Sequence, residues 1–189
     1  MGVSVLQDIQ EHWAQLCIKQ LVEQGIFSGY PDGTFQPDQP ITRAEFAVLI
    51  ARAFDVADQR PSRFFIDVPN HHWAAAAIQK VYRGGWLSGY PRNVFLPNQP
   101  MPRVQALVAL ASGLNLSPLQ VSPNLLAKYI DDANLVPSYA TRGIAAALEH
   151  QLVVNYPNQR LLEPDRPATR ADVAAFLHQA LVQQSGQPS

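Results

Sequence analysis

Apolar residues recur at helical spacing near the start of the chain, in the segment DIQEHWAQLCIKQLVEQG. Residues three or four apart in a helix lie on the same face, so this segment predicts one amphipathic helix. Asp8 is expected to be its N-cap and Gly25 its stop. The apolar face of this helix would consist of Trp13, Leu16, Cys17, Leu21 and Val22.

A second amphipathic helix is expected after a segment rich in turn residues. Tyr30-Pro31-Asp32-Gly33 has turn chemistry, because Pro fixes φ and Gly accepts the left-handed region. Pro37 and Pro40 keep the following residues extended. Thr42 and Glu45 then form a capping box at the helix start. The apolar positions of this helix are Phe46, Leu49, Ile50 and Ala53.

The unit of helix, turn, extended segment and helix occurs three times. Tyr30 and Tyr90 are 60 residues apart, and Tyr156 follows after another 66. Self-similarity at this spacing indicates one supersecondary unit used repeatedly, each too small to bury its own apolar face. The sequence predicts an all-α fold with repeats at residues 1–58, 59–122 and 123–189, which form one cooperative domain around a shared helical core.

An arginine begins the second helix of every unit, at Arg43, Arg103 and Arg170. The positive end of the helix dipole makes a cation slightly unfavourable there and an anion welcome. One interpretation is a salt bridge to a neighbouring carboxylate. The other, which we favour, is that the arginine and the free helix-terminal N–H groups together bind a carboxylate or a phosphate.

Composition limits the function classes. The 189 residues are 47% hydrophobic, enough to bury a core, and the formal net charge of −1 excludes a global basic field that would gather nucleic acid. No apolar run approaches the roughly 20 residues that span a bilayer. The N-terminal residues lack the features of a signal peptide, so we expect either a cytosolic chain or a region excised from a larger envelope protein.

No catalytic, metal or cofactor site is expected. Glycosidases need two carboxylates, but Gln105 and Asp172 stand where the first unit has Glu45, which is typical of a helix cap. His71 and His72 are adjacent and cannot both face one metal on a helix or strand. The sequence therefore favours a non-catalytic binding module over an enzyme.

The segments DIQEHWA, GYPDGTF and ITRAEF resemble the S-layer homology family, in three copies that cover essentially residues 6–182. The resemblance implies three helical prongs around a pseudo-threefold axis, with grooves between adjacent copies. It also implies cell-wall anchoring through polysaccharide linked to peptidoglycan, an anionic polymer that often carries pyruvylated amino sugars. Scarce lysine and frequent glutamine are more typical of a cyanobacterial member of the family.

The resemblance, together with the pairing of aromatic rings and arginines, gives the candidate carbohydrate-binding residues. They are Trp13, Gly29, Tyr30 and Arg43 in copy one, Trp73, Gly89, Tyr90 and Arg103 in copy two, and Tyr139, Tyr156 and Arg170 in copy three. The alternative for Trp13 and Trp73 is a place in the core, where Phe35 and Phe95 are also expected.

Copy three departs from the other two. Asn155 replaces the glycine before Tyr156, and one residue is inserted in the turn that follows. We therefore expect the groove formed by the copy-three turn to be the weakest, and Arg170 to be the least important of the three arginines. The competing hypothesis for all the grooves is a protein-interaction scaffold that binds a peptide or a partner helix.

Overall fold

The computed structural model describes residues 6–119 and 124–186, which contain helices and isolated backbone bridges but no β-sheet. The α-helices are α1 (Gln15–Glu23), α2 (Arg43–Ala53), α3 (Ala75–Arg83), α4 (Arg103–Gly113), α5 (Leu125–Tyr129), α6 (Thr141–Glu149) and α7 (Arg170–Ser185). Single 3-10 turns occur at Gln7–Ile9, Pro91–Asn93, Ala133–Leu135 and Ser138–Ala140. The predicted all-α class is confirmed. The expected repeat boundary between residues 122 and 123 lies outside the described residues.

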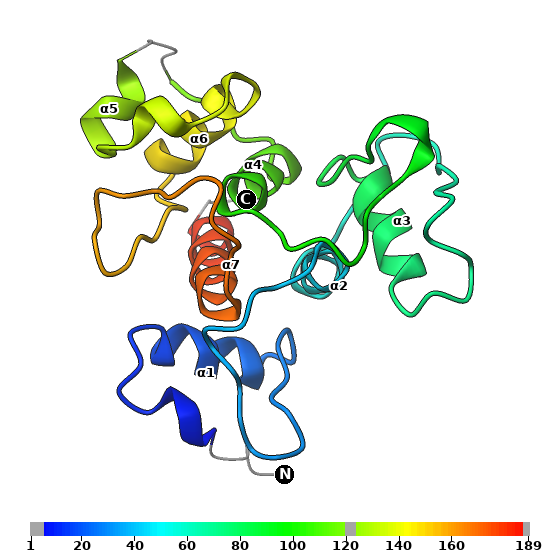
Figure 1. Cartoon of the computed structure of the whole chain (residues 1–189), viewed down its shortest axis with the longest axis horizontal. Coiled ribbons are helices and arrows are strands. Elements are labelled where there is room, and N and C mark those ends of the chain that lie inside the picture. Colours follow the sequence, from blue (N-terminus) through cyan, green and yellow to red (C-terminus); the bar gives the residue numbers. More distant parts are fainter. Residues whose placement is uncertain (1–5, 120–123, 187–189) are drawn as a thin grey trace.

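The second helix of each repeat lies at the centre of the molecule, and the first helix lies in a prong at its edge (Figure 1). The central helices are α2, α4 and α7. The prong helix α3 packs against α2, α6 against α4, and α1 against α7. Each prong helix therefore packs on the central helix of the preceding repeat, and α1 closes the circle by packing on the central helix of the third.

A closed ring of backbone hydrogen bonds joins the three extended segments at the centre. The N–H of Ile41 donates to the carbonyl of Ala168 at 2.9 Å, that of Ala168 to Met101 at 2.8 Å, and that of Met101 to Ile41 at 2.9 Å. All three residues are buried. Because every repeat gives one of these bonds and receives one, none can complete its backbone pairing without the other two.

The first N–H groups of the central helices are used in the same way. The N–H of Arg43 donates to the carbonyl of Gln99 at 2.9 Å, and that of Ala44 donates to Pro97 at 3.0 Å. The equivalent pairs are Arg103 with Arg166, Val104 with Pro164, Arg170 with Gln39, and Ala171 with Pro37. The expectation of free helix-terminal donors for an anion is therefore wrong, because the neighbouring repeat satisfies them.

The local signals in the second half of each repeat are confirmed. Thr42 with Glu45 forms the expected capping box, and Thr169 with Asp172 forms the equivalent one in repeat three. Gly33 lies in the left-handed region with a φ of 82°. The three arginines are each the first residue of their helix, as the sequence predicts.

The first helix starts later than the sequence suggests. It begins at Gln15, and Asp8 lies in a 3-10 turn where its carboxylate accepts hydrogen bonds from the N–H groups of Phe35 and Gln36 at 2.8 and 2.7 Å. Asp8 is therefore not a helix cap, because it holds the turn of its own repeat instead. Asp67 and Asp132 accept from two consecutive backbone N–H groups in the same way in the other repeats.

The core is continuous through all three repeats. Phe35 and Phe95 are fully buried, as expected, and Phe46 and Phe176 on the central helices are buried beside them. Trp73 is 64% exposed, so the core alternative for it is wrong. Trp13 packs against the core while remaining partly accessible.

We expect a chain that ends at residue 122 not to fold cooperatively. It lacks α7, so α1 loses its packing partner and the buried face of α4 loses α6. In circular dichroism, such a chain should melt without a sharp transition or aggregate, whereas the whole chain should show a single transition. A truncated chain that melted cooperatively at the temperature of the whole chain would contradict the shared core.

Candidate binding grooves between the repeats

Each arginine reaches from its own helix into the turn of the next repeat. Nε of Arg43 donates to the carbonyl of Phe95 at 2.9 Å, and Nη2 donates to that of Ser88 at 2.8 Å. The guanidinium also lies over the rings of Phe95 and Tyr90, 4.7 and 4.8 Å from their centroids. These contacts join repeat one to repeat two and hold the turn at one end of a groove.

Arg170 makes the same contacts around the circle, with the turn of repeat one. Its Nε donates to Phe35 and its Nη2 to Ser28, both at 2.8 Å. Its Nη1 has no hydrogen-bond partner among the described residues, whereas Nη1 of Arg43 donates to Gln105 at 3.1 Å. Arg170 is therefore the more open of these two cations.

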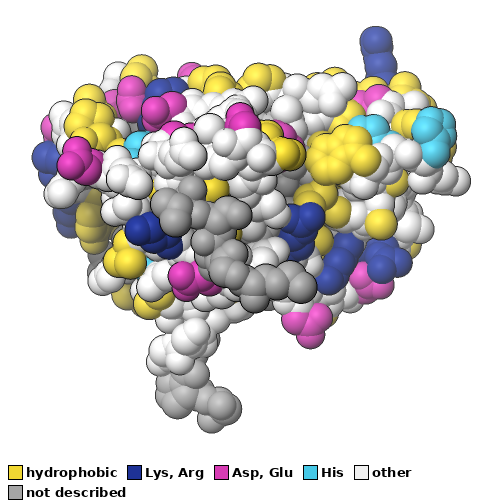
Figure 2. All heavy atoms as spheres, turned by 90° about the horizontal axis from the view of Figure 1, so that it is seen from below, with side chains coloured by type: hydrophobic (Ala, Val, Ile, Leu, Met, Phe, Trp, Pro, Cys, Tyr) yellow, Lys and Arg dark blue, Asp and Glu magenta, His cyan; other side chains and the backbone are white. Residues whose placement is uncertain are grey.

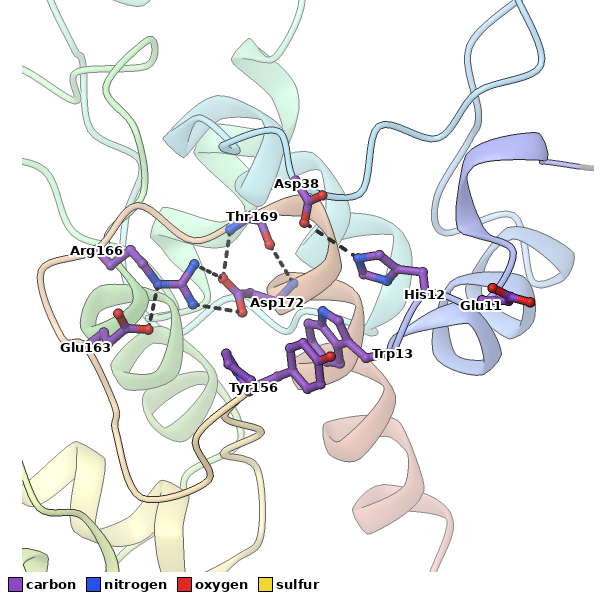
Figure 3. Close-up of a pocket in the computed structure, with 10 residues that line it drawn as sticks. Glu11, His12, Trp13, Asp38, Tyr156, Glu163, Arg166, Thr169 and Asp172 are labelled. Atoms are coloured by element: carbon purple, nitrogen blue, oxygen red, sulfur yellow. Dashed lines mark hydrogen bonds and ion pairs between the residues drawn. The ribbon is translucent and has the colours of Figure 1, made fainter.

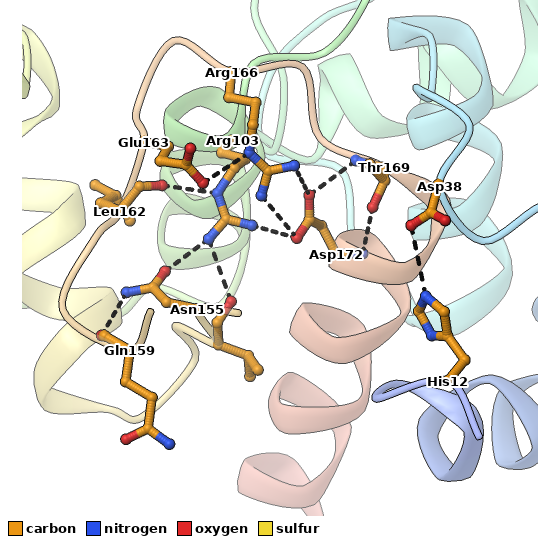
Figure 4. A network of polar contacts seen from close by, with 11 residues as sticks. His12, Asp38, Arg103, Asn155, Gln159, Leu162, Glu163, Arg166, Thr169 and Asp172 are labelled. Carbon is orange, nitrogen blue, oxygen red and sulfur yellow. Dashed lines mark hydrogen bonds and ion pairs between the residues drawn. The ribbon is translucent and has the colours of Figure 1, made fainter. Parts of the chain in front are cut away.

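Arg103 of repeat two is completely buried, and its side chain contacts residues of repeat three (Figure 4). It donates to the carbonyl of Leu162, to the side chain of Asn155 at 2.7 Å, and to the carboxylate of Asp172. Asp172 also pairs with Arg166 at 3.2 Å. The salt-bridge interpretation thus describes Arg103, whereas Arg43 and Arg170 contact mainly carbonyls and rings.

Burial lowers the pKa of all three arginines, because removing a guanidinium from water disfavours its charged form. Neighbouring groups oppose this effect: Tyr90 beside Arg43, Asp172 beside Arg103, and Tyr30 beside Arg170 raise the pKa again.

Two equivalent grooves lie between the repeats. Groove A has a volume of about 280 Å³ and groove B of about 390 Å³. The residues that line groove A include Gly29, Tyr30, Glu45, Val48, Leu49, Arg52, Trp73 and Arg170. The matching part of groove B is formed by Gly89, Tyr90, Gln105, Val108, Ala109, Ser112, Tyr139 and Arg43.

Each groove draws on all three repeats. In groove A, the turn comes from repeat one, the ring of Trp73 from repeat two and the arginine from repeat three. The candidates of copy one, Trp13, Gly29, Tyr30 and Arg43, therefore do not share one groove. The residues are brought together across repeats because each prong helix packs on the preceding repeat.

The third groove, groove C, has a different character (Figure 3). Its volume is about 510 Å³, and polar and charged residues form much of its wall, among them His12, Asp38, Glu163, Arg166 and Asp172. The rings of Trp13 and Tyr156 stack on each other, with centroids 5.1 Å apart and planes 12° apart. Each ring therefore covers one face of the other, although Tyr156 remains 52% exposed.

Asn155 occupies the place where the other repeats have glycine. Its side-chain oxygen accepts from Arg103, and its nitrogen donates to the carbonyl of Gln159 at 3.0 Å. At Gly29 and Gly89, a Cβ would collide with the side chains of Leu6 and of Phe65. The glycines are thus required by packing within their own repeats, whatever else approaches them.

Arg170 is not part of the groove formed by the copy-three turn. The expectation that Arg170 is the least important arginine assumed that it was, and that assumption is wrong. The arginine beside the copy-three turn is Arg103, because it contacts Val154 and Asn155. Sequence reasoning also missed Arg52, which lines groove A. No counterpart of Arg52 recurs in the other repeats, so the repeat pattern gave no signal for it.

Charge on the surface is local. In Figure 2, Lys and Arg side chains gather on the right of the face shown, on the side of α3, next to hydrophobic and histidine side chains. Elsewhere on that face acidic and basic side chains are both present, in keeping with the net charge of −1.

No group of three or more potential metal ligands occurs among the described residues. No helix in the described ranges is long and apolar enough to cross a membrane.

Comparison with known proteins identifies the class that this fold and these grooves define. A sequence model of the S-layer homology domain matches residues 7–47, 65–107 and 129–174. The chain therefore belongs to the S-layer homology domain family, with three repeats, as the sequence motifs predicted.

Similar proteins include a cell surface glycoprotein, a cellulosome-anchoring protein and an S-layer protein. The chain is 32% identical over 167 residues to cell surface glycoprotein 1 of Acetivibrio thermocellus, covering 80% of the chain and 7% of that protein. It is 36% identical over 118 residues to the cellulosome-anchoring protein of the same species, covering 57% of the chain and 25% of that protein. It is 28% identical over 167 residues to S-layer protein EA1 of Bacillus anthracis, covering 88% and 18%. The chain thus spans a quarter or less of each of these relatives, and the hint of a cyanobacterial source remains untested.

We expect Arg103→Met to destabilise the fold strongly. The change leaves the buried carboxylate of Asp172 without its main partner and removes the link to Leu162, a loss of about 3–5 kcal/mol. Arg142→Met, at an exposed position of α6, should change the free energy of unfolding by less than about 0.5 kcal/mol. Urea unfolding of both variants measures this. Equal stability of the two would show that the arginine does not join repeats two and three.

Proposed function

We propose that this chain is a non-catalytic module that anchors a larger envelope protein to the cell wall. Its partner is a polysaccharide linked to peptidoglycan that carries anionic groups, for example pyruvylated sugars. The observation that carries the proposal is the pair of equivalent grooves, each with an exposed ring, a tyrosine, a glycine turn and an arginine. The names of the relatives, a cellulosome-anchoring protein and an S-layer protein, support this role at the cell surface.

The chemistry of grooves A and B suits a sugar. Trp73 and Tyr139 are 64% and 65% exposed, and although the His72 ring packs on Trp73 with centroids 5.7 Å apart, each aromatic side chain presents surface to the C–H face of a pyranose ring. Val48 and Leu49 in groove A, and Val108 and Ala109 in groove B, give an apolar wall. In groove A, Nη1 of Arg170, which has no partner among the described residues, supplies a donor and positive charge for a polar or anionic substituent, whereas the buried Arg43 adds positive charge beside groove B.

Groove C contributes less in this proposal. The stacked rings of Trp13 and Tyr156 cover each other, and Arg103 is fully buried in its ion pair. Of the candidate residues, we therefore assign binding to Gly29, Tyr30, Trp73 and Arg170 in groove A and to Gly89, Tyr90, Tyr139 and Arg43 in groove B. Trp13, Tyr156 and Arg103 stay as candidates that become available only if the stacked pair opens.

The same grooves suit a peptide or a partner helix in the competing hypothesis. Polysaccharide binding requires that the cell wall retains its secondary polysaccharide, whereas binding of a peptide or a partner helix does not. Sacculi that retain their secondary polysaccharide should sediment the chain, and sacculi stripped of that polymer should not. Equal sedimentation with stripped sacculi would reject the polysaccharide as the partner.

We expect Trp73→Ala and Tyr139→Ala each to weaken binding to sacculi, and the double variant to weaken it most. Loss of one stacking ring should lower affinity by about tenfold, and both rings are so exposed that the fold should be unaffected. Phe64→Ala is the matched control, since Phe64 is 70% exposed and lines none of the three grooves. Sedimentation at several protein concentrations measures the affinities. If the control lost as much binding as the groove variants, the grooves would not be the site.

A further inference from the structure

Grooves A and B are lined by residues at equivalent positions of the repeats, but the charges of these residues differ at both ends of the groove. At the turn end, groove A has Glu45 beside Arg170, and groove B has the neutral Gln105 beside Arg43. At the far end, two helical turns along the central helix, groove A has Arg52, and groove B has Ser112. Each groove therefore carries one net positive charge, but at opposite ends.

The charges at the turn end of groove A oppose each other. Glu45 holds its place because its carboxylate accepts from the N–H and the hydroxyl of Thr42, at 2.7 and 2.9 Å, within the capping box. Its negative charge acts on the Arg170 guanidinium across the groove. In groove B, the side chain of Gln105 accepts from Arg43 without adding charge. Asp8 and Asp67 stand in matching places beside the two arginines, so they do not alter the comparison.

Arg52 is the cation at the far end of groove A. It lies in the last turn of α2, about 10 Å along the helix axis from Glu45 at 1.5 Å per residue. The residue is exposed, and the hydrogen bond from its Nη1 to the carbonyl of Ile26 is long, at 3.4 Å. Arg52 has no ion-pair partner in the described ranges of the chain. Most of its donors therefore remain available to a ligand.

We propose that Arg52 determines where groove A places the anionic substituent of its glycan. Groove A takes that substituent at the far end of α2, against Arg52. Groove B has Ser112 at that position, and its arginine, Arg43, is buried with Nε, Nη1 and Nη2 all hydrogen-bonded within the protein. The two grooves thus differ in preference: groove A favours a segment with an anionic substituent at the Arg52 end, and groove B has, within the described ranges, no exposed cation in the matching place. This inference rests on the proposed wall-polysaccharide function.

The test isolates groove A and measures its preference for charge. Tyr139→Ala serves as the background, because it removes the stacking ring of groove B. The probes are wall fragments released from sacculi by a muramidase and separated on an anion exchanger into charged and uncharged pools. Calorimetry compares Arg52→Ser with its parent in that background. We expect Arg52→Ser to weaken binding of the charged pool by about tenfold and to leave the uncharged pool unchanged.

A charge-shift variant distinguishes this role from a purely structural one. Adding Glu45→Gln to Arg52→Ser removes the negative charge that opposes Arg170, whose Nη1 has no partner among the described residues, and glutamine also completes a capping box. We expect this double variant to recover most of the affinity for the charged pool. Arg142→Ser, which removes one exposed arginine outside the three grooves, is the control for net charge and should leave the affinity unchanged.

Three outcomes would overturn the inference. Arg52→Ser could bind the charged pool as well as its parent does, it could lose both pools equally, or the double variant could fail to recover. A loss of both pools equally would assign Arg52 to the end of α2, where a basic side chain stabilises a helix terminus. Failure of the unaltered chain to bind sacculi is a different result, because it would reject the proposed function itself.

Discussion

The structure depends on the exchange of backbone hydrogen bonds between repeats. The ring through Ile41, Met101 and Ala168 closes on itself, and the first N–H groups of each central helix donate to carbonyls of a neighbouring repeat. Unpaired N–H and C=O groups in the interior are costly, so an isolated repeat would leave several of them unsatisfied. The repeats therefore behave as parts of one domain, although each has its own motif.

The arginines extend this exchange from the backbone to the side chains. Each one leaves the start of its helix and donates to two carbonyls of the next repeat's turn, and it lies against aromatic rings. A cation at that position is slightly unfavourable for its own helix, and the contacts to the next repeat compensate. The arginine thus has a structural role in all three repeats. What differs is how much of it remains open, from Arg170 through Arg43 to the fully buried Arg103.

The grooves are a consequence of this arrangement. Because each prong helix packs on the preceding repeat, the ring of one repeat, the turn of a second and the arginine of a third meet at one place. Sequence motifs predicted the repeats, the capping boxes and the turns, since these depend on short-range chemistry, and they included the rings, glycines and arginines that line grooves A and B. They could not show which repeats share a groove, because the packing of each prong helix on the preceding repeat leaves no signal in the local sequence. The same limit explains Asp8, whose partners Phe35 and Gln36 lie far along the chain, and Arg52, which has no counterpart in the repeats.

Native-state hydrogen exchange of the amides of Ile41, Met101 and Ala168 tests the closed ring most directly. These three N–H groups belong to three different repeats and form the ring itself. Our account predicts that all three exchange only through global unfolding, with one common opening free energy that equals the free energy of unfolding from urea titration. If any one of them exchanged through an opening of lower free energy while the other two stayed protected, the repeats would open separately, and the account would be contradicted.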